Sequence, residues 1–94
     1  MTGQYHDHSL SSPRFDPEVM RRHLAGLAAA IAGTEDRVAD TFERLALTHP
    51  YDASGLLARA ARARQYATLE RNRAAVFNRQ ADRAAQEADR AAQK

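Results

Sequence analysis

Residues 16–48, DPEVMRRHLAGLAAAIAGTEDRVADTFERLALT, decide the fold of this chain. Apolar residues recur in the stretch every seven positions in two interleaved series, so that neighbours in the pattern lie three or four residues apart. This spacing is typical of a helix that packs lengthwise against another helix. The larger members of the pattern are Met20, Leu24, Leu27, Ile31, Val38 and Leu45.

A second apolar stripe lies beside the first and consists mainly of alanine. Its members are Ala25, Ala28, Ala32, Ala39, Phe42 and Ala46. One helix therefore offers two adjacent contact faces. We expect the stripe of larger residues to pack inside the molecule. The alanine stripe is expected to meet a partner chain, because small residues let a second helix approach closely.

Both ends of this helix carry strong signals. At residues 16–18, Asp-Pro-Glu, the aspartate can cap free N–H groups, proline fits the first turn, and glutamate complements the helix dipole. At the other end, His49 precedes Pro50 and is therefore pushed out of the α region. We predict a helix over residues 17–48, with a length of roughly 48 Å.

A break at Gly33 is the alternative to one continuous helix. Glycine followed by Thr34, Glu35 and Asp36 also fits a helix end and a new helix cap. The apolar stripes keep their phase across the glycine, and an interior glycine costs a helix only about 1 kcal/mol. These two observations favour the continuous helix.

The connection after this helix is short. Residues 50–55, PYDASG, contain proline and glycine, and Asp52 or Ser54 can cap a following helix. After this stretch the chain has no further glycine or proline, and alanine and arginine, both strong helix formers, dominate. We therefore predict a turn at 49–53 and a second helix at about 54–90.

Two helices that are joined by a short turn run antiparallel. Folding the chain at the turn places Leu45 near Leu56 and Val38 near Ala63, while roughly the last ten residues overhang. Large residues of the first helix would then meet small residues of the second along most of their contact. The expected stripe of the second helix is Leu56, Ala60, Ala63, Ala67, Ala74, Phe77 and Ala81.

Composition narrows the functional classes. The chain has no cysteine, which excludes disulfides and thiolate metal sites. Residues 1–15 show no periodicity and are expected to form a disordered N-terminal arm, in which His6 and His8 lack further nearby ligands. The longest apolar run, residues 25–32, is too short to span a bilayer, and the N-terminus lacks the pattern of a signal peptide. We therefore predict a cytoplasmic protein without membrane contact.

Motifs of catalysis and cofactor binding are missing from the sequence. There is no phosphate-binding glycine loop, no nucleophile elbow and no HExxH. Asp36, Asp40 and Glu43 have spacings that suit a carboxylate metal site, but the Glu-x-x-His motif of helical sites of this kind is absent. We interpret these carboxylates as a charged surface and predict no catalytic, metal or cofactor site.

The second helix is strongly basic, and Glu70 is the one acid between Leu56 and Gln80. An arginine ridge can hold phosphates, and Tyr66 could stack on a base, so a nucleic-acid- or ribosome-associated hairpin is the alternative function. Arginine heads can also pair with acids of the first helix or of a partner. The arginines concerned are Arg59, Arg62, Arg64, Arg71, Arg73 and Arg79.

Part of this basic helix has the composition of a protein interface. Arg62, Tyr66, Leu69, Arg73 and Val76 share one side of the helix. Such a mixture of arginine, tyrosine and aliphatic area is more typical of protein interfaces than of a phosphate track. The favoured function is therefore a non-enzymatic helical interaction or scaffold protein that self-associates and binds a protein partner.

These patterns together predict an all-α protein. The expected architecture is an antiparallel hairpin of two long helices with a flexible N-terminal arm, which dimerises into a four-helix bundle. A single hairpin needs one apolar stripe per helix, so a homodimer would cover the surplus stripes. The expected dimer or partner interface comprises Ala25, Ala28, Ala32, Ala39, Phe42, Leu57, Tyr66, Leu69 and Val76.

Circular dichroism of the purified chain checks the helical content. We expect a helical fraction well above half, because the predicted helices cover most of the sequence. A fraction under about half would contradict the hairpin, since soluble proteins average only about one third helix.

Overall fold

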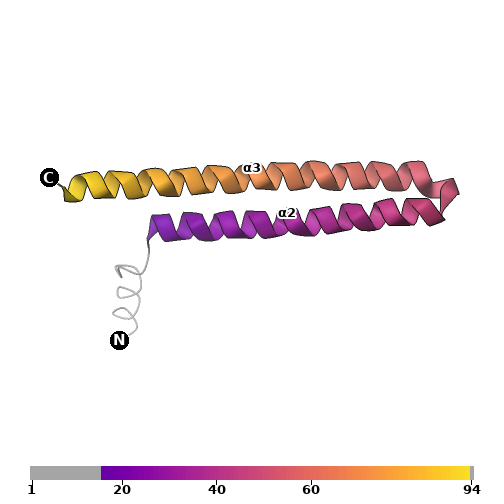
Figure 1. Cartoon of the computed structure of the whole chain (residues 1–94), viewed down its shortest axis with the longest axis horizontal. Coiled ribbons are helices and arrows are strands. Elements are labelled where there is room, and N and C mark those ends of the chain that lie inside the picture. The colour runs from indigo at the N-terminus through magenta and orange to yellow at the C-terminus, as the bar shows by residue number, and fades with distance from the viewer. Residues whose placement is uncertain (1–15, 94) are drawn as a thin grey trace, which may run out of the picture.

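The computed structural model describes residues 16–93, which form two long antiparallel α-helices joined by a short turn (Figure 1). Helix α2 spans Pro17–Thr48, the 3-10 helix η1 spans Pro50–Asp52, and helix α3 spans Ala53–Ala92. The described residues contain no strand, which confirms the predicted all-α class and the packing of two helices against each other. The predicted arm, residues 1–15, lies outside the described residues.

Helix α2 begins where its capping residues predict. The Asp16 carboxylate accepts a hydrogen bond of 2.9 Å from the Glu18 backbone N–H, and Pro17 occupies the first turn. The helix then runs through Gly33 without a break, so the alternative of two shorter helices is wrong. A Cβ atom added at Gly33 would meet only the Arg37 guanidinium, at 3.8 Å, so close packing does not require glycine there.

At the turn, backbone groups and the His49 ring lie within hydrogen-bonding distance of free groups at the helix ends. His49 leaves the helical region, with φ −131° and ψ 73°, and its Nδ1 lies 3.0 Å from a carbonyl oxygen of the last α2 turn. The Ala53 N–H donates to the Pro50 carbonyl. No side chain caps the start of helix α3, so the predicted capping by Asp52 or Ser54 is wrong. The 3-10 turn instead leads directly into α3.

Alanine alone makes up the buried core of the described residues. Two half-buried phenylalanines, Phe42 and Phe77, pack against this core. Small side chains on both helices let the two backbones approach closely along their whole contact. We name this contact the alanine seam; its members are Ala25, Ala28, Ala32, Ala39 and Ala46 of α2, and Ala60, Ala63, Ala67, Ala74 and Ala81 of α3.

In the structure, the two stripes of the first helix lie in the opposite places from those predicted. The stripe of large residues, expected in the core, lies at the surface, where Leu27 and Ile31 are 49% and 48% exposed. The alanine stripe, expected to meet a partner, lies inside the hairpin instead. The predicted orientation of α2 differs from the observed one by a rotation of about 100° about the helix axis, which is the angle between consecutive residues.

The predicted alignment of the two helices along their length agrees with the structure. Ala39 packs with Ala60 and Ala63. The prediction placed Val38 near Ala63, so the predicted and observed alignments differ by one residue. Helix α3 continues past the start of α2 (Figure 1), and Ala81 is its last buried residue. The C-terminal part of α3 therefore overhangs, as the lengths of the two helices predict.

Charged residues account for the rotation of α2. Asp36, Asp40 and Glu43 lie beside the alanine seam, and from there they reach an arginine of α3. If the stripe of large residues faced α3, the same carboxylates would turn about 100° away from that helix, and the ion pairs would be lost. Alanine in the seam also brings the helices close enough for these pairs to form.

The residues on either side of the seam form two opposite broad faces of the hairpin. In antiparallel helices, the residues that directly follow seam positions share one side, and those that directly precede them share the other. The first side is the ion-paired face: Arg22, Asp36, Asp40, Glu43, Arg64, Arg71 and Asp82. The second side is the apolar face: Met20, Leu24, Leu27, Ile31, Val38 and Leu45 of α2, with Tyr66, Leu69 and Val76 of α3.

Enlarging a seam residue tests this packing. Ala39 is fully buried, so Ala39→Leu should overpack the seam and lower the free energy of unfolding by roughly 1–3 kcal/mol. The control Ala30→Leu changes an exposed position on the same helix and should have an effect within about 0.5 kcal/mol. Urea denaturation of both variants measures the difference. Equal stability of the two variants would contradict the alanine seam.

Candidate interaction surface

Arg64 is the centre of the ion-paired face. Its Nη2 lies 2.7 Å from Glu43 Oε1 and 2.8 Å from Asp40 Oδ1, and its Nε donates to the other Glu43 oxygen at 3.3 Å. Its Nη1 donates to Asp36 Oδ1 at 3.4 Å. One guanidinium of α3 thus holds three carboxylates of α2, in the forked geometry that favours arginine over lysine.

Two further arginines extend this network. Arg71 of α3 donates to the second oxygen of Asp36. This hydrogen bond, with a smaller contribution from Arg64, lowers the pKa of the Asp36 carboxyl below its ordinary value. Near the open end of the hairpin, Arg22 donates to Asp82 at 2.9 Å, which raises the pKa of Arg22. The ion-paired face therefore joins α2 to α3 at points far apart along the hairpin.

These ion pairs explain why three acids of α2 are spaced four and three residues apart in the sequence. Asp36, Asp40 and Glu43 are partners of Arg64, and Asp40 forms no ion pair with Arg44, four residues further along α2. Arg44 instead donates to Thr41 at 3.5 Å. No group of three or more His, Cys, Asp or Glu side chains within residues 16–93 is placed to hold a metal ion.

The α2 half of the apolar face carries no charge. Leu24 is half-buried, the other large side chains are between 37% and 49% exposed, and the threonines between them bond to their own helix. Thr34 donates to the Ala30 carbonyl at 3.2 Å, and Thr41 donates to the Arg37 carbonyl at 3.0 Å. The threonine hydroxyl donors are therefore already used, and this half offers mainly methyl and methylene groups.

The α3 half of the same face mixes apolar and basic side chains. Tyr66, Leu69 and Val76 are exposed, Leu69 by 60%. Three arginines precede seam positions on α3 and therefore lie on this side: Arg59, Arg62 and Arg73. Arg59 places its guanidinium carbon 5.9 Å from the centre of the Phe42 ring, and Arg73 lies 3.9 Å from Glu70.

The predicted interface residues fall into three groups in the structure. Ala25, Ala28, Ala32 and Ala39 are buried in the seam and cannot contact a partner, so their assignment to an interface is wrong. Phe42 is half-buried against the same seam. The exposed residues divide between the faces: Tyr66, Leu69 and Val76 lie on the apolar face, and Leu57 lies on the side of Arg64.

Sequence reasoning missed the surface position of the large α2 residues. A signal for it was present, because the heptad positions of Asp36 and Glu43 are those that must face the arginines of α3. Placing these acids beside the second helix would have rotated the leucine stripe to the surface. The predicted arginine cluster is likewise divided: Arg64 and Arg71 are held by acids, while Arg79 lies on the far side of α3 from the seam.

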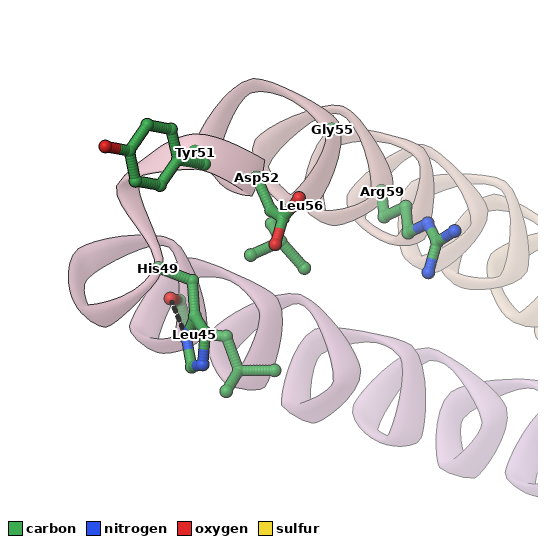
Figure 2. Close-up of a pocket in the computed structure, with 7 residues that line it drawn as sticks. All are labelled: Leu45, His49, Tyr51, Asp52, Gly55, Leu56 and Arg59. Carbon is green, nitrogen blue, oxygen red and sulfur yellow. Dashed lines mark hydrogen bonds between the residues drawn. The ribbon is translucent and has the colours of Figure 1, made fainter.

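An open hollow of about 560 Å³ lies at the turn (Figure 2). Figure 2 shows Leu56 directed into the space between the helices and Tyr51 directed away from it. Leu45 and Arg59, which precede seam positions, belong to its lining, so the hollow is continuous with the turn end of the apolar face. Its full lining is Leu45, His49, Tyr51, Asp52, Gly55, Leu56 and Arg59.

Comparison with protein-family models, with curated proteins and with solved structures finds no match to this chain. Neither α2 nor α3 contains a stretch that is long and apolar enough to cross a membrane.

The lowered pKa of Asp36 predicts how stability depends on pH. The unfolded carboxyl has a pKa of about 3.9, so the ionised form stabilises the fold above that pH. This contribution disappears as the pH falls through the lower pKa of the folded state. Asp36→Asn should therefore lower the melting temperature at pH 7, and the difference from the unchanged chain should shrink below about pH 4.

Thermal unfolding followed by circular dichroism at pH 7, 4 and 2.5 measures this difference. Asp89→Asn is the matched control, since Asp89 lies on the overhanging part of α3 and forms no ion pair within the described residues. A difference between Asp36→Asn and the unchanged chain that stays constant down to pH 2.5 would contradict the ion-pair assignment.

Proposed function

We propose that this protein is a non-enzymatic helical interaction protein, which binds helices of a partner through its apolar face. The observation that carries the proposal is the distribution of side-chain size. The hairpin uses its smallest apolar residues for its own core, while most of its larger aliphatic residues line one side; Val19, Leu47 and Leu57 are exposed on the other. A monomer that needed no partner would bury the larger residues.

The energetics of the apolar face support this role. Soluble monomers rarely expose a long, contiguous apolar patch, and a patch of this kind usually marks an interaction site. Covering about 800 Å² of apolar surface would be worth roughly 20 kcal/mol before the costs of association and side-chain ordering. Lost translational and rotational freedom and side-chain ordering offset much of this free energy.

The ion-paired face supports the proposal because it joins the two helices and so keeps the side chains of the apolar face in one arrangement. The Arg64 cluster and the pair of Arg22 with Asp82 join the two helices at separate heights of the hairpin. Together with the alanine seam, they fix the rotation of each helix and thus the position of every side chain on the other side. A preorganised surface loses less conformational entropy on binding.

The proposal includes two kinds of partner. One is a second copy of the chain, as in the predicted four-helix bundle, although such a dimer would use the apolar face rather than the alanine stripe. The other is a helix of a different protein. A phosphate-binding role receives less support, because Arg64 and Arg71 of the predicted arginine ridge already bind carboxylates of α2.

Site-specific photocrosslinking in the native cell tests the proposal. The photoreactive residue p-benzoylphenylalanine, introduced at Ile31 or Leu69, should form crosslinks to the same chain or to another protein. At Ala29 or Ala75, which are exposed on the opposite side, it should form few. Equal yields on both sides, or none at Ile31 and Leu69, would overturn the role of the apolar face.

A further inference from the structure

We propose that the apolar face receives an amphipathic α-helix of another protein whose apolar stripe is bordered by aspartate and glutamate. This inference rests on the proposed function and names the chemistry of its partner. It follows from the charges that border the apolar face, from the place of every acid on the hairpin, and from the size of the uncharged strip.

Arginines border the uncharged strip on its α3 side. Arg62 directly precedes Ala63, and Arg73 directly precedes Ala74, so both lie on the apolar side of α3. Arg62 forms no ion pair within residues 16–93, and the single contact of Arg73 with a carboxylate, Glu70, is long at 3.9 Å. Both guanidiniums can therefore take a carboxylate from outside the chain without breaking a short ion pair.

Arginines also border the strip on its outer α2 side. Arg37 donates to Thr34 at 3.2 Å, and Arg44 donates to Thr41 at 3.5 Å. Thr34 and Thr41 occupy the same heptad position as Leu27, so these two guanidiniums lie along the outer edge of the uncharged strip. The apolar strip thus runs between two rows of positive charge.

Within residues 16–93, the single carboxylate paired with these arginines is that of Glu70, at 3.9 Å from Arg73. The acids between residues 17 and 83 lie in the seam, on the ion-paired face or at the turn: Glu18, Glu35, Asp36, Asp40, Glu43, Asp52, Glu70 and Asp82. A second copy packed face to face would therefore bring more arginine and no acid, which disfavours the dimer. A partner of opposite charge would satisfy both rows.

The strip is long enough to contact a partner helix over several turns. It extends from Leu24 to Leu45, a distance of roughly 31 Å along α2, which corresponds to about six helical turns. A partner helix with leucine or isoleucine at alternating spacings of three and four would fill it, and its flanking carboxylates would meet the arginines in forked hydrogen bonds. The mixture of Tyr66 and Leu69 with arginine is typical of a protein interface and favours a helix over a lipid surface.

Two synthetic peptides of about four heptads test the inference. Both carry leucine at the first and fourth heptad positions; one has glutamate at the flanking positions, and the other has lysine. Isothermal titration calorimetry against the full chain should give at least about tenfold tighter binding for the glutamate peptide. The double variant Arg62→Glu, Arg73→Glu should reverse the preference, whereas Arg79→Glu, on the far side of α3, should leave it unchanged.

Other outcomes overturn the inference in distinguishable ways. Equal binding of both peptides, lost in Ile31→Glu, would refute the acidic partner and retain the proposed function. A dimer in sedimentation equilibrium that Ile31→Glu dissociates, without peptide binding, would identify a second copy instead. Binding to vesicles of anionic phospholipid, without binding to the glutamate peptide, would identify a membrane surface. Circular dichroism of each variant confirms that the hairpin remains folded.

Discussion

The close contact of alanine with alanine is the constraint on which the rest of this structure depends. Methyl groups from both helices fill the fully buried part of the seam, and the larger Phe42 and Phe77 pack half-buried against it. Across this contact the Arg64 guanidinium reaches three carboxylates of α2. The same contact leaves no space inside the hairpin for the leucine stripe, which therefore lies at the surface.

The ion pairs complement the seam, because alanine by itself specifies rotation weakly. Both stripes of α2 have heptad spacing, and either could lie against the small residues of α3 on the basis of periodicity alone. Arginines and carboxylates distinguish the two arrangements, since they pair in only one. Exposed ion pairs usually stabilise a protein little, so their main effect here is on specificity: they select one rotation of α2 over the other.

Much of the fold could be predicted from the sequence. Proline and aspartate at residues 16–17, the phase of the stripes across Gly33, and His49 before Pro50 predict two long helices and their alignment. The rotation of α2 could not be read from hydrophobicity, which places the largest residues inside. In the candidate site, Tyr66, Leu69 and Val76 were predicted as interface residues, while Ile31 and its neighbours were assigned to the core because their size and heptad spacing fit a buried stripe equally well.

The alanine seam also limits the change in heat capacity when the hairpin unfolds. Heat capacity rises on unfolding mainly because apolar area becomes hydrated, and a core of alanine buries little such area. The stability of the hairpin alone should therefore vary only gently with temperature, with a broad and shallow maximum. Any helix that covered the leucines and valines of the apolar face would remove further apolar area from water, so its binding would carry a negative heat-capacity change of its own.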